Sequence, residues 1–477
     1  MRVSEYYGIR RTQPTLDFVD VDISGDVRLF VDPRALRLLK TDWATDCVAL
    51  IQNFFHTVLQ AIQEGEHEHA RGLLSALKEP NETHLGLSRG RAQGRALGHK
   101  SAREVWEALS KSEAVRTGLL EDLEDTILMV PGISSDIVSD MATNIIREPL
   151  IRYTQDVCAY YGIPVQVDVD SGPLWDPRDR EWYSEFSALP VTSAGKLLLV
   201  PKAIVRRRMD YNEDEYYRYY VLEFLREMEL SANTKLVRLL KSGVHRVTKK
   251  DLIKKYGAGK EMIVDITRKH PEILDRYRDA KRRSVAPPLN HPELAEYDEK
   301  ASPDWDALLG EVIHLDHGRP AATQYEEAIE KLLTALFYPS LTNPKVQKEI
   351  HGGRKRIDIT YANVSTYGFF AWLSQHYTAP FVFVECKNYS SDPGNEALDQ
   401  LAGRFSPRRG RFGILVCRTI TDKDLFRQRC RDTADDGRGF IVPLDDDDLR
   451  LLVDERKQAS GHAEFGILRE LFDQLVM

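Results

Sequence analysis

The sequence has little of what marks a secreted, membrane-spanning or zinc-ribbon protein. Only five of its 477 residues are cysteine, and no two of them have the CxxC spacing. We therefore expect neither a zinc ribbon nor a disulfide framework, and interpret the cysteines as buried thiols. No apolar run approaches the roughly 18 residues of a membrane span, and the opening segment MRVSEYYGIR lacks the apolar core of a signal peptide. A cytoplasmic protein without a membrane partner is expected.

Two motifs that bind nucleotides or calcium are also missing. The segment GAGK at residues 257–260 resembles the end of a phosphate-binding loop, but Lys254 stands where that loop needs glycine and Glu261 where it needs Ser or Thr. The four aspartates at residues 445–448 lack the spacing and the glycine of an EF-hand. We expect them to cap the positive end of a helix instead.

The net charge of −8 gives no sign of a uniformly basic nucleic-acid-binding protein, so any such surface must be local. Between residues 321 and 430, 15 Lys and Arg stand against 11 Asp and Glu. The basic excess therefore lies in the C-terminal third of the chain.

The length of the chain predicts several domains, because single cores stop growing at about 250 to 300 residues. A composition of 42% hydrophobic and 29% charged residues is typical of a globular protein. We expect a mixed, mostly helical domain at residues 1–164 and a mixed α/β region at 165–283 that packs with it. A proline-containing linker at 284–320 and a C-terminal domain at 321–477 follow.

The first half of the chain is expected to combine helices with short strands. Residues 16–23 and 27–31 flank a Ser-Gly-Asp turn and predict a β-hairpin, whose acidic residues we interpret as solvated. Apolar residues at helical spacing from about Asp42 to Glu64 predict a long amphipathic helix. The basic, glycine-rich segment Ser88–Lys100 is either a phosphate-contacting loop or an ordinary exposed one.

A pair of helices is predicted after Thr248, which is a suitable N-cap, with Gly257 as the stop of the first helix. Such a pair is either a DNA-reading helix-turn-helix or a plain helix pair. We favour the plain pair, because helix pairs are far commoner than DNA-reading ones.

Two predicted strands in the C-terminal part carry the residues of greatest chemical interest. The run Phe381–Lys387 is rich in Phe and Val, and Glu385 and Lys387 lie two residues apart on it, so they share a face. In the run Arg356–Thr360, Asp358 points away from the face that its isoleucine neighbours bury. Asp358 and Glu385 converge if the two strands pair.

These groups suit the hydrolysis of a phosphodiester. Mg²⁺ is usually held by one or two carboxylates, waters and substrate phosphate oxygens. A bound Mg²⁺ or Mn²⁺ would polarise the phosphate and acidify a water, and Lys387 would steady the attacking hydroxide or the charge on phosphorus. We therefore predict Asp358 and Glu385 as metal ligands and Lys387 as a catalytic residue.

Neighbouring segments add supporting groups. A helix from about Ala321 carries an apolar stripe that ends at Phe337, and Glu326 borders this stripe, so it is the glutamate of this helix that best reaches the site. A helix with Gln400 follows the second strand. Basic residues near both strands are candidate contacts to nucleic acid, and a solvated turn is the alternative for the last four: Arg354, Lys355, Arg356, Arg404, Arg408, Arg409 and Arg411.

An ordered set of motifs resembles the PD-(D/E)xK nuclease superfamily, in particular its restriction-endonuclease-like branch related to Mrr. The motifs are Tyr325-Glu326, GGRKRIDI with Asp358, VECKN with Glu385 and Lys387, and Gln400, and the resemblance covers roughly residues 321–453. It implies a mixed sheet flanked by helices and a Mg²⁺-dependent phosphodiesterase. In similar enzymes the Asp and the strand Glu ligate metal, the Lys assists the water, and the helix Glu and Gln support the site.

Two features depart from that family. Ile357 stands where many members have proline, which matters little. The insertion Tyr361–Ala379 lengthens the connection between the two strands. It is open to three interpretations: a substrate wedge, a dimer contact or packing.

The predicted protein is multidomain, α/β and α+β, with a C-terminal restriction-endonuclease-like sheet after a largely helical region with short strands. We predict a Mg²⁺-dependent DNA endonuclease of a restriction or phage-defence system, with an N-terminal region that senses or regulates. The alternatives are a non-catalytic DNA-binding or regulatory subunit that retains the nuclease fold, and a repair or resolvase-type nuclease. Expected partners are DNA, further copies of the chain in a homodimer or higher oligomer, and a protein bound by the N-terminal region.

Overall fold

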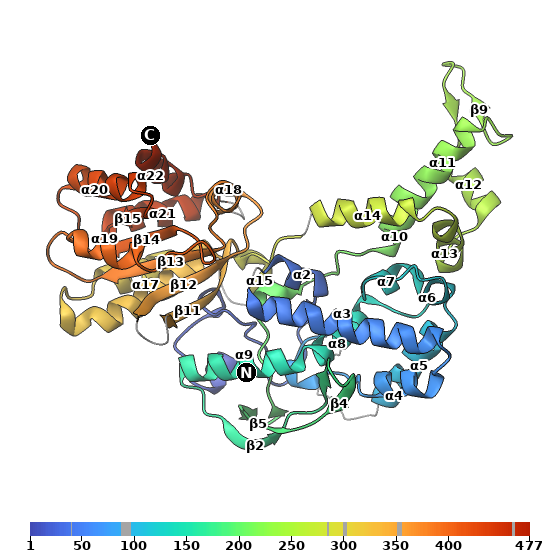
Figure 1. The fold of residues 1–477 in the computed structure, drawn as a ribbon, viewed down its shortest axis with the longest axis horizontal. Helices are drawn as coiled ribbons and strands as arrows, with labels where there is room; N and C mark the ends of the chain where they lie inside the picture. The colour runs from blue at the N-terminus through green and yellow to red at the C-terminus, as the bar shows by residue number, and fades with distance from the viewer. Residues whose placement is uncertain (40, 87–96, 284–285, 299–302, 351–354, 460–462) are drawn as a thin grey trace.

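The computed structural model of the chain describes residues 1–39, 41–86, 97–283, 286–298, 303–350, 355–459 and 463–477. Buried apolar residues gather in two large cores, one formed mostly by residues 3–294 and the other by residues 308–475. We call residues 1–298 the N-terminal unit and residues 303–477 the C-terminal unit; Figure 1 shows them side by side. Within the described ranges, no helix has the length and apolarity needed to cross a membrane.

The C-terminal unit is built on a five-stranded sheet in the order β11-β12-β13-β14-β15. The strands are Leu341–Ile350, Lys355–Asn363, Phe381–Lys387, Phe412–Cys417 and Phe440–Leu444. β11, β12 and β13 are antiparallel, whereas β13, β14 and β15 are parallel, with a helix in each parallel connection. Every residue of β14 is buried, as expected for a strand that helices cover on both faces. The expected mixed sheet flanked by helices is therefore present.

Both outer strands of this sheet depart from a regular ladder. A bulge interrupts the pairing of β11 with β12 between Thr342 and Lys345, where Asn343 has a φ of +53° and Pro344 follows. β15 contains Pro443, opposite Leu415 of β14. Proline has no N–H to give to a ladder, so it is confined to edge strands, strand starts and bulges.

The helices around the sheet form two groups. In the first group, α16 and α17 pack on each other and on α21; in the second, α18, α19 and α20 join α22 around β12 to β15. In chain order these helices are α16 (Trp305–Ile313), α17 (Ala322–Phe337), α18 (Gly368–His376), α19 (Asn395–Ala402), α20 (Lys423–Asp435), α21 (Asp446–Gln458) and α22 (Gly466–Val476). As expected, the aspartates cap α21: the Asp445 carboxylate accepts from the amides of Asp447 and Asp448.

The insertion between β12 and β13 is a packing element. It contains α18, whose Phe369 and Phe370 are buried. The Phe370 ring lies 5.2 Å from that of Phe337 and 5.3 Å from that of Phe465, so the insertion closes the end of the C-terminal core.

The stretch expected as a linker holds helices of both units. α15 (His291–Asp298) contributes Leu294 to the N-terminal core, and α16 contributes Leu308 and Val312 to the C-terminal core. Pro292 lies in the first turn of α15, where proline is tolerated because that N–H has no helical partner. This stretch therefore contains helices, although its polar, proline-containing composition is typical of a linker.

The N-terminal unit is mostly helical, with small two-stranded sheets. The predicted long helix is α3 (Asp42–Gln63), which packs on α8 (Ser135–Ile145) and α9 (Arg147–Tyr161). The shorter helices of the first part of the N-terminal unit are α1 (Val3–Tyr6), α2 (Pro33–Leu38), α4 (His67–Ser75), α5 (Leu97–Ser110), α6 (Glu113–Arg116) and α7 (Asp125–Met129). The paired strands are β1 (Phe30–Val31) with β8 (Val205–Arg206), β2 (Gln166–Asp170) with β5 (Phe186–Leu189), β3 (Leu174–Asp176) with β4 (Glu181–Tyr183), and β6 (Val191–Thr192) with β7 (Gly195–Lys196).

The hairpin predicted for residues 16–31 is wrong. Phe18 bridges to Pro201 and Val27 to Leu85, so the two segments pair with other parts of the chain. Two of their acidic residues are buried rather than solvated, since Asp17 and Asp20 are 7% and 1% exposed, whereas the Asp22 side chain is 40% exposed. Within the two segments only Phe30–Val31 forms a strand, and Phe18, Asp22 and Val27 make isolated bridges. The alternation of apolar residues does not identify the partner of a segment.

A helical arm projects from the N-terminal unit (Figure 1). It consists of α10 (Glu213–Tyr216), a π-helical turn (Tyr217–Val221), α11 (Leu222–Ser231), the hairpin β9–β10 (Arg238–Leu239 and His245–Arg246), and α12 (Lys249–Tyr256). α13 (Lys260–Lys269) and α14 (Glu272–Arg283) return the chain to the body. The helix pair predicted after Thr248 is present as α12 and α13, with the Thr248 hydroxyl accepting from the amide of Asp251 at 3.2 Å.

Buried polar contacts join the two units. Arg11 makes an ion pair of 2.5 Å with Glu330 of α17, and the Tyr160 hydroxyl donates to the same carboxylate at 3.0 Å. The Asn343 amide of β11 donates to Asp17 at 2.9 Å. The Lys202 ammonium lies 4.0 Å from the centre of the Tyr338 ring. The N-terminal unit therefore rests on α17 and on the first half of β11.

Candidate active site

The candidate site lies where β12 and β13 begin to separate. Their ladder runs from Ala362 opposite Phe381 to Ile359 opposite Val384 and ends one residue before Asp358 and Glu385. Beyond it, the Cys386 amide donates to the Asp358 carboxylate at 2.9 Å. The Asp358 carboxylate thus serves as acceptor where the backbone ladder has ended, and this hydrogen bond fixes the carboxylate beside β13.

Glu385, Lys387 and Gln400 form one hydrogen-bonded group. The Lys387 ammonium donates to Glu385 Oε1 at 2.8 Å and to Gln400 Oε1 at 3.0 Å. The Gln400 amide also donates to Glu385 Oε1. The Glu385 residue is fully buried, and its second oxygen, Oε2, is buried without a partner among the described residues. The lone pairs of this oxygen therefore accept no hydrogen bond from the described residues.

Burial and mutual repulsion raise the pKa values of the two carboxyls. Burial raises the pKa of Asp358; burial and then the charge of Asp358 raise the pKa of Glu385. Burial alone would favour the neutral amine of Lys387, but the charges of Glu385 and Asp358 outweigh it and raise the pKa of Lys387. The site therefore holds one ammonium between two carboxyls that are costly to ionise together.

Glu326 of α17 lies close enough to take part. Its carboxylate accepts from the Gln347 amide at 2.8 Å. Burial, followed by the charge of Asp358, raises the pKa of Glu326, and Lys387 opposes this. The other two glutamates of α17 have different surroundings, because Glu327 is exposed and Glu330 is buried against the N-terminal unit. The structure thus brings together the five residues predicted as catalytic.

The predicted nucleic-acid contacts are more dispersed. Arg404 is 9% exposed and acts on the pKa values of both Asp358 and Glu385, so it lies beside the carboxyls rather than on the open surface. Arg356, Arg408 and Arg411 are exposed, and Arg409 is half-buried, donating to the Arg404 carbonyl at 3.0 Å. Arg354 and the Lys355 side chain lie outside the described residues.

The donor set fits a hard divalent cation held by few protein ligands. Within the described ranges, no three or more His, Cys, Asp or Glu side chains cluster so as to hold an ion. Two carboxylates are nevertheless a usual set for Mg²⁺, which keeps several waters and takes phosphate oxygens from its substrate. The unpartnered Glu385 Oε2 is the atom that such an ion would satisfy first.

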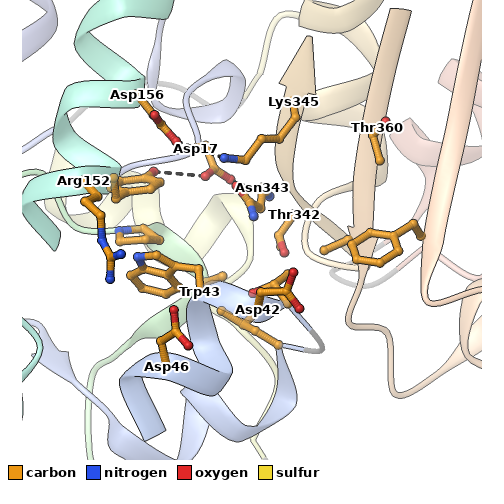
Figure 2. A pocket seen from close by; sticks show the side chains of 17 residues that line it. Asp17, Asp42, Trp43, Asp46, Arg152, Asp156, Thr342, Asn343, Lys345 and Thr360 are labelled. Carbon is orange, nitrogen blue, oxygen red and sulfur yellow. Dashed lines mark hydrogen bonds and ion pairs between the residues drawn. The ribbon is translucent and has the colours of Figure 1, made fainter. Parts of the chain in front are cut away.

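Sequence reasoning missed two cavities where the units meet. One, of about 780 Å³, is lined by Arg10 and Tyr160 of the N-terminal unit and by Glu326 and Gln347 of the candidate site. The other, of about 360 Å³, lies over β11 and β12 (Figure 2). Figure 2 labels these of its lining residues: Asp17, Asp42, Trp43, Asp46, Arg152, Asp156, Thr342, Asn343, Lys345 and Thr360. Both cavities combine segments far apart in the chain, so no local motif indicates them.

Comparison with known proteins gives a match within the N-terminal unit and none in the C-terminal unit. Residues 8–212, less than half of the chain, match a family model described as a domain of unknown function, DUF8370. No curated protein and no solved structure matches the chain.

Proposed function

We propose that the chain is a Mg²⁺-dependent DNA endonuclease whose N-terminal unit regulates access to the site, as in a restriction or phage-defence effector. The observation that carries the proposal is the position of Asp358, held by the Cys386 amide, beside Glu385, whose Oε1 binds the Lys387 ammonium and whose Oε2 is buried without a partner among the described residues. The order of these residues in a mixed sheet, which resembles the PD-(D/E)xK nucleases, supports it.

Each residue has a role that follows from its contacts. Asp358 and Glu385 would hold the ion, which when bound polarises the phosphate and acidifies a water. Gln400 holds the Lys387 ammonium in place at 3.0 Å, so that Lys387 steadies the attacking hydroxide or the charge on phosphorus. Glu326 supports the site from α17, and Arg404 offsets part of the carboxylate charge.

Contacts between the units support the regulatory part of the proposal. Glu330, which pairs with Arg11, stands one helical turn after Glu326 on α17. A shift of the N-terminal unit would therefore displace α17, the helix that carries Glu326. The cavity of about 780 Å³ gives the two units a common wall beside Glu326.

Supercoiled plasmid tests the proposal directly. The full-length protein is expected to nick or linearise it with Mg²⁺ or Mn²⁺ and to stop when EDTA is added, and Asp358→Asn is expected to lower the rate at least about a hundredfold. Asp424→Asn, at a fully exposed aspartate, is the matched control and should cut at the wild-type rate. Intact plasmid and single-stranded DNA with every divalent ion, or equal cutting by Asp358→Asn, would reject the site.

The pH dependence of metal binding provides a test that needs no cleavage. Because the pKa values of Asp358 and Glu385 are raised in the folded chain, their contribution to stability is full below the ordinary values of 3.8 and 4.5 and is lost as the pH rises above them. Mg²⁺ binds the ionised carboxylates, so it should raise the melting temperature more at about pH 8 than at about pH 5. Scanning fluorimetry measures this, and the effect should vanish in Asp358→Asn.

A further inference from the structure

The tip of the helical arm has a charge unlike that of the rest of the chain. Residues 235–255 hold eight Lys and Arg and one acid, Asp251, which is a net charge of +7 in a chain whose total is −8. The preceding helical segment, residues 213–231, holds six acids against two arginines. The arm therefore has an acidic stem and a strongly basic tip.

Most of the basic side chains at the tip make no ion pair with any residue that the structure describes. Arg238 pairs with Asp251 at 2.9 Å, and Lys249 and Lys255 pair with glutamates of α11. The others are exposed and make no ion pair with any described residue: Lys235, Lys241, Arg246, Lys250 and Lys254. Like charges held together this way repel one another unless an external anion lies between them.

The hairpin adds a specific case of this repulsion. Arg246 of β10 stands directly opposite Arg238 of β9, on the same face of the two-stranded ribbon. Like charges in this position destabilise a strand pair, and Asp251 offsets the repulsion on the Arg238 side alone, so an anionic partner at Arg246 would lower the remaining cost. A tight turn with Gly243 at φ +77° closes the ribbon, and Val244 beside it is 58% exposed.

We propose that this tip, residues 235–255, binds double-stranded nucleic acid through its phosphates. A two-stranded ribbon is narrow enough to enter a major groove about 12 Å wide. Lys250 and Lys254 on α12 lie one helical turn apart and extend the positive surface beside the ribbon. Figure 1 shows the tip standing clear of both units, so a long rigid duplex can approach it.

An anionic membrane fits the tip less well. A helix that lies on a membrane needs a continuous apolar face. α12 turns Leu252 into the core of the arm and leaves only Ile253 as a markedly exposed apolar residue. The exposed aliphatic residues near the turn, Leu239, Leu240 and Val244, form a small patch on the hairpin. The cations, in contrast, extend over the hairpin and the helix together.

Duplex binding by full-length protein tests the proposal, and the inference does not depend on whether the chain cuts DNA. In an Asp358→Asn background, four unpaired cations are changed together: Lys241→Ala, Arg246→Ala, Lys250→Ala and Lys254→Ala. Fluorescence anisotropy with a short DNA duplex should show binding weakened at least about tenfold at 0.1 M salt. The slope of log K against log salt should flatten by about 3 to 4, because each phosphate contact contributes about 0.9.

The control changes four exposed cations on the body to alanine: Arg71, Arg103, Lys111 and Arg116, which are 54%, 68%, 76% and 61% exposed. It should bind the duplex within about twofold of the parent, because these cations lie outside residues 235–255, and it should fold normally, since surface ion pairs contribute little to stability. Circular dichroism and melting curves check that both variants fold. Equal binding by the arm and control variants would overturn the proposal. Capture on phosphatidylserine vesicles without duplex binding would overturn it as well and identify a membrane as the partner.

Discussion

Glu385→Gln is expected to lower Mg²⁺-dependent plasmid cleavage about a thousandfold or more, and to abolish the thermal stabilisation by Mg²⁺. The substitution keeps the size of the side chain and leaves an amide oxygen that can still accept from Lys387 and Gln400. It replaces the buried, unpartnered Oε2 by an NH₂ group, which cannot ligate a cation. The loss therefore reports on charge and ligation rather than on packing.

Cleavage of supercoiled plasmid at several Mg²⁺ concentrations and a melting curve with and without the ion measure the two effects. Glu396→Gln makes the same chemical change at an exposed position of α19 and should leave both unchanged. A Glu385→Gln protein that cuts within about tenfold of the wild type would place the metal elsewhere.

Glu330→Ala is expected to lower the free energy of unfolding by about 3 to 5 kcal/mol. The Glu330 side chain is 0% exposed and that of Arg11 is 12% exposed, so removing the carboxylate leaves a guanidinium with little access to water. The substitution also removes the acceptor of the Tyr160 and Thr334 hydroxyls. Thr334 keeps the Tyr361 hydroxyl as a partner at 3.0 Å and Tyr160 is 40% exposed, so the guanidinium left without its carboxylate accounts for most of the loss.

Urea denaturation followed by far-UV circular dichroism measures this loss. Glu327→Ala, at the exposed position three residues earlier on α17, should change the free energy by less than about 0.5 kcal/mol. Arg11→Ala combined with Glu330→Ala should cost clearly less than the sum of the two single changes, since they share one interaction. Additive costs would mean that the ion pair does not stabilise the contact between the units.

Local patterns predicted which helices and strands form better than they predicted which elements lie next to one another. The helical spacing of apolar residues from Asp42 and from Ala321 predicted α3 and α17, because a helix that buries one face repeats every 3.6 residues. The hairpin at residues 16–31 failed because alternation fixes the face of a strand and not its partner. The helices in residues 284–320 were missed because proline in a first turn and polar residues on an outer face look like a linker.

The candidate site could be predicted because its residues occupy short motifs. Strand periodicity places Glu385 and Lys387 on one face of their strand. Asp358 joins them because its strand pairs with theirs, a condition that periodicity alone does not supply. The position of Arg404 beside the carboxyls was not predictable, since it depends on how the segment after α19 folds back. The contact between Arg11 and Glu330 joins residues more than 300 positions apart, and no local pattern contains it.

The prolines in the two outer strands restrict how copies of this chain can associate. An exposed sheet edge offers unpaired N–H and C=O groups to a strand of another molecule, and this is a common route to aggregation and to dimers that share one sheet. In β11 the bulge and Pro344 interrupt the row of backbone donors, and the backbone N–H of Asn343 already donates to the Asp17 carboxylate. In β15 the donor is missing at Pro443. Both edges of the five-stranded sheet therefore offer an interrupted row of donors, which disfavours a dimer in which the sheets of two copies join edge to edge.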